Sequence, residues 1–205
     1  LVLDEAHHLP ATALDQFACA MDLSRTGWVD KLAARVVRIG GLLAVSEVAD
    51  VHRLSSQLKQ TLLDLSRLVM DLYGSQLNEP KGAWGPARAR VPQGQLPAAL
   101  DEPLRMLLVT AESYLDCVSA VAKALRAEIR DKPEEARRLS TLYAQIGMLA
   151  PRLEDVVSTA QLLLQDAGSQ DDPAPERKVP AAKWFTCEVV GDFIVVKAHA
   201  SPILP

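Results

Sequence analysis

The sequence predicts a mainly α-helical protein, an antiparallel bundle of long helices flanked by short β segments. Composition is the first observation: 49% of the 205 residues are hydrophobic but only 4% are aromatic, an aliphatic balance that favours helices packed on helices. Periodicity is the second, because leucine and other apolar residues recur every three or four positions through most of the chain. The two ends lack this period and carry short β-rich runs, so we expect strands there.

The chain opens with a short apolar run, Leu1-Val2-Leu3, followed by Asp4-Glu5. A buried parallel strand that ends at a nucleotide site commonly has this form, because it delivers carboxylates to the phosphates and their metal ion. From 11 to 22 the apolar residues have helical spacing, which predicts a short amphipathic helix.

Three helices are expected next. One follows Thr26 and bends or breaks at Gly40-Gly41, because each glycine costs about 1 kcal/mol relative to alanine. The second spans 47–73, a length of roughly 40 Å, and ends at Gly74-Ser75. The third covers 100–128. The apolar stripe of the second helix consists of Val51, Leu54, Leu58, Leu62, Leu65, Leu68 and Leu72.

A last helix is predicted after Pro133, because proline and the acidic residues that follow it suit a first helical turn. Its apolar residues run from Leu139 to Leu163 at spacings of three and four, a coiled-coil-like seam. Pro151 falls inside this seam without shifting it, so we expect a kink rather than an end of the helix.

Two β-rich runs, 184–190 and 193–198, follow a polar linker at 167–178. Gly191-Asp192 joins the two runs, which predicts a β-hairpin. A helical excursion inserted between strands of one sheet is the simplest topology for this order of elements.

The segment 78–97 is the clearest loop, because its four prolines and three glycines rule out a stable helix or a central strand. It is also locally basic: Lys81, Arg88 and Arg90 surround Trp84, with no acidic residue among them. Cations and an indole are the groups that hold a single nucleic-acid strand, through phosphate contacts and base stacking. We therefore predict these four residues as DNA-binding, and a solvated connector is the alternative.

Two motifs resemble a known family. Asp4-Glu5-Ala6-His7 resembles the DEAH box of superfamily 2 helicases. The order of Lys183-Trp184-Phe185-Thr186, Gly191-Asp192-Phe193 and the run from Ala200 to Leu204 is similar to the segment that re-enters the first motor domain of XPD-like DNA helicases, in the bacterial DinG and YoaA branch. In that family a long helical insertion, the arch, separates the two motifs.

The resemblance implies three parts: the DEAH-box strand of motor domain 1 at 1–10, a helical arch domain at 11–178, and a hairpin at 179–205 that returns to motor domain 1. Because the chain begins at Leu1 without a start methionine, we expect it to be a fragment of a longer helicase. In that family, ATP hydrolysis drives 5′→3′ translocation on single-stranded DNA, and the arch helps to guide the strand.

The resemblance also implies catalytic roles. Asp4 would hold the Mg²⁺ ion that accompanies ATP, Glu5 would activate the attacking water, and His7 would couple the nucleotide site to neighbouring motifs. The sequence has no phosphate-binding loop of the form G-x-x-x-x-G-K-[ST], so ATP hydrolysis is expected in the parent helicase and not in this chain alone. Members of the family often carry an iron–sulfur cluster, which would lie outside this chain.

Other chemistries fit poorly. His7-His8 lacks the spacing of a zinc-binding helix, and His52 and His199 have no evident catalytic partners in the sequence. His52 is expected on the solvent side of its helix. The three cysteines, Cys19, Cys117 and Cys187, do not have the spacing of a zinc site, and we expect them to be reduced thiols.

The formal net charge of −4 argues against a strongly basic, free-standing nucleic-acid domain, so any DNA contact must come from a local patch. The apolar runs are too short to cross a membrane, and we expect a soluble, cytoplasmic bacterial protein. The resemblance implies single-stranded DNA, the rest of the motor, and replication or repair proteins as partners. A helical protein–protein interaction module with exposed apolar stripes, or a structural spacer without DNA contact, is the alternative function.

Overall fold

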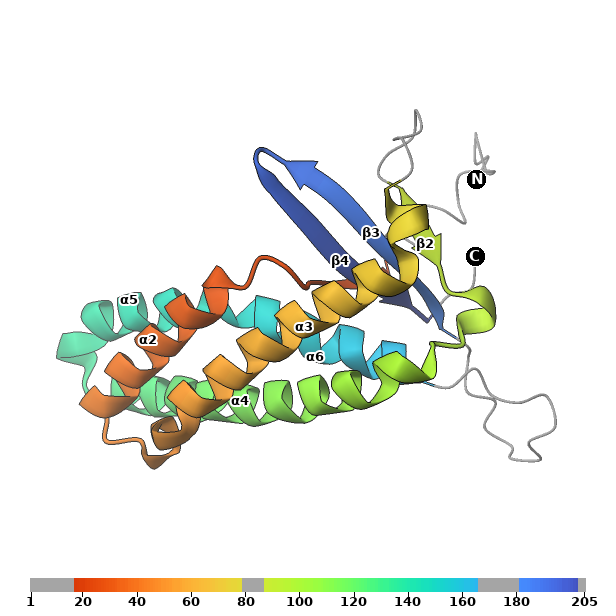
Figure 1. Cartoon of the computed structure of the whole chain (residues 1–205). Coiled ribbons are helices and arrows are strands. Elements are labelled where there is room, and N and C mark those ends of the chain that lie inside the picture. The colour runs from red at the N-terminus through yellow and green to blue at the C-terminus, as the bar shows by residue number, and fades with distance from the viewer. Residues whose placement is uncertain (1–16, 79–86, 166–180, 203–205) are drawn as a thin grey trace, which may run out of the picture.

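The computed structural model of the chain describes residues 17–78, 87–165 and 181–202. Figure 1 shows an elongated body of helices, with a small sheet near the C-terminal end of helix α3. Within the described residues the architecture is mainly helical with short antiparallel strands, so the predicted fold class is confirmed. The elements are β1 (Cys19–Asp22), α2 (Gly27–Leu42), α3 (Val51–Leu77), β2 (Arg88–Arg90), α4 (Ala98–Asp131), α5 (Ala136–Gly147), α6 (Ala150–Leu164), β3 (Ala182–Val190) and β4 (Phe193–Ser201), with short 3-10 segments at Ser46–Asp50, Pro92–Gly94 and Pro133–Glu135.

The two longest helices, α3 and α4, form the centre of the body. Their 27 and 34 residues correspond to about 40 and 50 Å of helix. Helix α4 packs against α3 on one side and against α5 and α6 on another, so its apolar positions Leu107 and Leu125 have no exposed surface. Burial of apolar area, worth about 25 cal/mol per Å², is the main stabilising contribution of these contacts.

The apolar stripe of α3 departs from its predicted course in the second half of the helix. Leu65 is buried as expected, but Val69 and Tyr73 occupy the next core positions, while Leu72 is 40% exposed. The predicted stripe advanced by 3.5 residues per turn, a spacing that drifts around any α-helix that does not supercoil. The prediction of Leu72 as a core residue is wrong for this reason.

Cys19–Asp22 is a strand, so the predicted helix over 11–22 is wrong for its described last residues. Burial here alternates instead of following a helical period: Met21 and Leu23 are buried, and the residues between and before them are half-buried. The strand gains its hydrogen bonds from β4, with Cys19 opposite Ala200 and Asp22 opposite Lys197. Pairing with a distant strand therefore overrides the local pattern.

Helix boundaries were predicted with mixed success. Helix α2 ends just after Gly40-Gly41, as expected, and the region around Pro133 separates α4 from α5. The predicted stop at Gly74 is wrong, because α3 continues to Leu77 and the amide of Asn78 bonds the carbonyl oxygen of Gly74 at 2.9 Å. A single glycine weakens a helix without ending it when neighbouring turns are packed.

Pro151 marks a break and not a kink. Helix α5 ends at Gly147, α6 begins at Ala150, and Pro151 occupies the first turn of α6. Proline suits that position, because the first amide groups of a helix have no intrahelical acceptor. The apolar seam continues through both helices, with Ile146 and Leu153 buried, and this continuity concealed the break from the sequence pattern.

The sheet is antiparallel, with strand order β1-β4-β3-β2. The predicted hairpin is confirmed: Val190 pairs with Phe193 across the two-residue turn, and Gly191 has a φ of 63° that glycine adopts without strain. One face of the sheet packs on α6 and α3 through Phe185, Ala198 and neighbours. Helices α2 and α3 lie between β1 and β2 in the chain, and α4–α6 between β2 and β3. The predicted helical excursion that starts from a strand at 1–10 stays a prediction.

Hydrogen bonds fasten the sheet to the helical body. The Leu23 amide donates to the Val196 carbonyl oxygen at 2.9 Å, and the Val196 amide donates to the Ser24 hydroxyl at 3.0 Å. The buried ammonium group of Lys183 donates to the Gln165 carbonyl oxygen at 2.7 Å, just beyond the end of α6. A cation at that position also complements the helix dipole.

The far end of the β3–β4 hairpin carries an exposed apolar tip, formed by Val189, Val190, Phe193 and Ile194, which are 44–71% exposed. The hairpin projects away from the helices at this end (Figure 1). Because Val189 pairs with Ile194 and Val190 with Phe193, the tip is apolar on both faces of the sheet. By contrast, the apolar stripes of the long helices face one another.

Several predicted segments lie outside the described residues: the strand at 1–10, the linker at 167–178, and the part of the loop at 79–86. The described part of that loop contains β2, an edge strand, which agrees with the exclusion of a central strand. The division into parts at 1–10, 11–178 and 179–205 stays a prediction.

We predict that Gly40→Ala destabilises the protein by about 1–2 kcal/mol, while Gly41→Ala stabilises it by up to about 1 kcal/mol. A methyl group on Gly40 would overlap Cγ1 of Val48 and lie 3.1 Å from Cγ2 of Val121, whereas one on Gly41 meets nothing within 4 Å. Both glycines are in α2, so the pair separates close packing from helix propensity. Urea unfolding of the two variants measures the difference, and equal effects would contradict the packing argument.

Candidate functional site

The predicted site residues fall into two groups. Asp4, Glu5 and His7 lie outside the described residues, as do Lys81 and Trp84. Arg88 and Arg90, the remaining two predicted DNA-binding residues, are both in β2, and their side chains are exposed.

Strand β2 directs its two arginines to the same side of the sheet. Ala89 lies between them and is completely buried on the helix-packed side. Because side chains alternate along a strand, Arg88 and Arg90 belong to the opposite side, which we call the distal face. In the register of the sheet Arg88 is opposite Thr186 and Arg90 is opposite Trp184.

The distal face contains two cross-strand rows. One row crosses the sheet from Arg90 through Trp184 and His199 to Ala20, and the other from Arg88 through Thr186 and Lys197 to Asp22. Residues directly opposite each other in neighbouring strands have close side chains, so each row is a line of contacts. The rows place two arginines and a lysine on one side of the sheet.

His199 holds the middle of this face together. Its ring stacks on Trp184 with centroids 5.2 Å apart and an interplanar angle of 5°, and its Nε2 atom is 2.9 Å from the Thr186 hydroxyl. Trp184 and Thr186 are themselves buried, at 6% and 4% exposure. The exposed charged groups of these two rows are therefore the arginines at the β2 edge, while Lys197 and Asp22 are half-buried.

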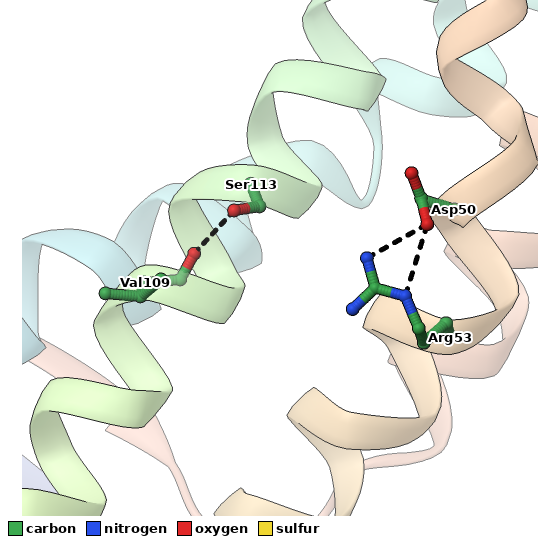
Figure 2. A network of polar contacts seen from close by, with 4 residues as sticks. All are labelled: Asp50, Arg53, Val109 and Ser113. Carbon is green, nitrogen blue, oxygen red and sulfur yellow. Dashed lines mark hydrogen bonds and ion pairs between the residues drawn. The ribbon is translucent and has the colours of Figure 1, made fainter.

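Several cations on the helices have acidic partners close by. Figure 2 shows one such pair, in which the Arg53 guanidinium donates twice to Asp50 Oδ1, at 2.9 and 3.2 Å. The same figure shows the Ser113 hydroxyl donating to the Val109 carbonyl oxygen within α4. Exposed pairs of this kind add at most about 1 kcal/mol, but they cancel local charge. The others are Lys59–Asp30, Arg67–Asp64, Arg105–Asp101, Arg130–Asp131, Lys132–Glu128 and Arg138–Glu135.

A second group of cations, near the sheet, lacks such partners; Arg152 of this group is in the first turn of α6. Among the described residues, no ion pair or hydrogen bond engages the side chains of Arg25, Arg88, Arg90, Arg152 and Lys197. Sequence reasoning found only the two in β2, because they occur in one short segment. The alternating pattern of its strand could have placed Lys197 on one face of the sheet. No local sequence pattern marks Arg25 or Arg152 as site residues.

Comparison with known proteins gives one informative match. No family model matches the chain. The chain is 23% identical over 197 residues to the ATP-dependent DNA helicase DinG of Photobacterium profundum, covering 95% of this chain and 27% of that protein. This similarity supports a relationship to DinG-like helicases. The chain spans only about a quarter of the length of the relative that it matches.

The described helices include none that is both long and apolar enough to cross a membrane. His52 is exposed on α3, as predicted. In the described part of the chain, no group of three His, Cys, Asp or Glu residues is arranged to hold a metal ion.

Burial raises the pKa of all three cysteine thiols, with smaller contributions from nearby carboxylates such as Asp155 at Cys19 and Glu188 at Cys187. A raised pKa leaves less thiolate, the reactive form, at neutral pH. We predict that iodoacetamide modifies all three cysteines more slowly in the folded chain than in urea at pH 7.5, and that the folded-state rates are still rising above pH 9. Rates measured by mass spectrometry that plateau below pH 8 would contradict this.

Proposed function

We propose that this chain is a section of an ATP-dependent DNA helicase of the DinG type, and that it helps to guide single-stranded DNA during unwinding. The observation that carries the proposal is the similarity to the DinG helicase along 95% of the chain. The DEAH sequence at residues 4–7 adds an independent motif, because an apolar run that leads directly into it suits a nucleotide-binding strand.

In this proposal the long helices correspond to the arch domain of the parent helicase. Their insertion between strands of one sheet supports it, because an arch leaves the motor domain and returns to it. Asp4 would hold Mg²⁺ with ATP, Glu5 would activate water and His7 would couple the site to other motifs, all within the parent. An iron–sulfur cluster would belong to a part of the parent outside this chain, and the parent would work in the bacterial cytoplasm.

The proposed DNA contact begins at β2. Arg88 and Arg90 are exposed, side by side on the distal face, and lack an acidic partner among the described residues. Lys81 and Trp84 lie a few positions earlier in the chain and would add a phosphate contact and a stacking surface. An exposed pair of arginines on an edge strand suits a flexible polyanion, because both guanidinium groups can follow the backbone of the strand.

The exposed apolar tip supports contact with the rest of the motor. Isolated surface apolar residues are ordinary, but a patch that is apolar on both faces of a hairpin suits burial against another surface. The matched helicase is almost four times as long as the matched segment, so the parent contains further surfaces for this contact.

A second candidate function is protein–protein interaction without DNA contact. The apolar stripes of α3 and α4 are buried against neighbouring helices, which disfavours docking of a partner helix on the described bundle. The apolar tip is the observation that favours interaction, and a replication or repair protein is the class of partner that the parent would meet.

We predict that the Arg88→Ala/Arg90→Ala double variant binds a fluorescent oligothymidylate of about 15 nucleotides more weakly than the unaltered chain, measured by fluorescence anisotropy at low salt. The slope of log K against log salt should fall by about 1.4, or about 0.7 for each lost phosphate contact. Trp84→Ala should weaken binding by about 1–3 kcal/mol.

Lys123→Ala/Arg137→Ala is the matched control, because these exposed cations on α4 and α5 also lack acidic partners among the described residues. Equal binding by the β2 variant and the unaltered chain would contradict a DNA contact at β2.

We also predict that the purified chain does not hydrolyse ATP in the presence of Mg²⁺, because it has no loop to hold the β- and γ-phosphates. Phosphate release assays measure this against the Asp4→Asn/Glu5→Gln variant. Turnover that disappears in this variant would show that the chain is active alone; turnover that persists would identify a contaminating enzyme.

A further inference from the structure

A cleft of about 350 Å³ lies where the β1 edge of the sheet meets the helices. Arg25 lies in the connection between β1 and α2, Arg152 in the first turn of α6, and Lys197 in β4, and all three side chains line the cleft. Trp28 and His199 contribute aromatic surface to the wall. Three cations that are far apart in sequence are therefore brought to one concave surface.

None of these three cations has an ion-pair or hydrogen-bond partner among the described residues. Several helix cations have the opposite arrangement, with an acid within one turn, as in Arg67–Asp64. Cations that converge on a cleft without ion-pair partners repel one another, and an anion relieves this repulsion.

The cleft also contains two acids, Asp22 and Asp155, which leave a net charge of +1 when both are ionised. Asp22 is already engaged: its Oδ1 atom accepts hydrogen bonds from the amides of Ser24 and Arg25 at 3.1 and 2.9 Å. Burial raises the pKa of the Asp155 carboxyl.

The cleft is continuous with the distal face. Lys197 lines the cleft and also belongs to the row that crosses the sheet to Arg88. Neighbouring strands are about 4.8 Å apart, so the β2 edge lies only about 10 Å from β4. A chain with repeated phosphates can therefore reach from the arginines of β2 to Lys197, and from there to Arg25 and Arg152.

We infer that this cleft binds backbone phosphates of a single-stranded nucleic acid, as a second contact beyond the arginines of β2. The inference rests on the proposed function and extends it by naming Arg25, Arg152 and Lys197. Phosphate is the recognised chemistry, and a polynucleotide fits better than a free phosphate because the cations come from three separate elements around an open cleft. A site for one small anion instead concentrates backbone amides at a helix N-terminus or a glycine-rich loop.

The test measures binding of the purified chain to the fluorescent oligothymidylate across a range of salt concentrations. The Arg25→Ala/Arg152→Ala/Lys197→Ala variant should bind roughly tenfold more weakly at low salt, and its salt slope should be lower by about 2. The matched control, Lys123→Ala/Arg130→Ala/Arg137→Ala, removes the same charge from the C-terminal half of α4 and from α5, and it should retain the affinity of the unaltered chain. Circular dichroism and thermal unfolding check that both variants fold.

Competition separates the two sources of phosphate. Unlabelled oligothymidylate should displace the probe, while inorganic phosphate and ATP at the same total phosphate concentration should not; equal displacement by either would overturn the assignment to a strand. If the cleft variant and the control weaken binding equally, the loss of affinity reflects net charge alone, and the cleft is not a binding site.

Failure of the inference is distinguishable from failure of the proposed function. If the cleft variant binds like the unaltered chain while Arg88→Ala/Arg90→Ala binds weakly, the cleft contact is wrong and the DNA contact at β2 stands. If the unaltered chain binds no oligothymidylate at low salt, both are wrong.

Discussion

The pairing of β4 with β1 is the constraint on which the rest of the fold depends. It joins residues 19–22 to residues 197–200, so almost the whole chain is closed into one loop by a few backbone hydrogen bonds. Closing so long a loop costs conformational entropy, and the buried helix faces supply the offsetting free energy. The same pairing places Lys197 beside Asp22 and brings β4 against α6. Both the closure of the bundle and the shape of the cleft follow from it.

The parts of the fold that sequence predicted well are those encoded locally. The hairpin around Gly191 and the cores of α3 and α4 depend on neighbours within a few positions, so spacing and turn chemistry were sufficient. The strand at Cys19–Asp22 was missed because its residues continue a helical spacing that starts at residue 11, while its strand partner lies far along the chain. The break at Pro151 was predicted as a kink because the apolar spacing continues in register across the two separate helices α5 and α6.

The candidate site shows the same division. Arg88 and Arg90 could be predicted as site residues because they lie two positions apart in a short basic segment, and the structure shows both exposed in an edge strand; their role in DNA binding stays a prediction. Arg25, Arg152 and Lys197 were not found, because only the packing of α6 on the sheet brings them together. The net charge of −4 also gave no hint of them, because a chain with a negative total can still gather several cations without ion-pair partners at one place.

The short edge strands of the sheet have a consequence for solubility. An open edge presents free amides and carbonyls to which another chain can add, the first step of edge-to-edge aggregation. Here β1 offers four residues and β2 three, and the two arginines of β2 would carry like charges against a second copy. The short length of the edge strands and the charges of β2 therefore disfavour edge-to-edge aggregation, even though the tip of the hairpin is apolar. A surface that repels its own copy and attracts a polyanion disfavours self-association and leaves the proposed nucleic-acid contact accessible.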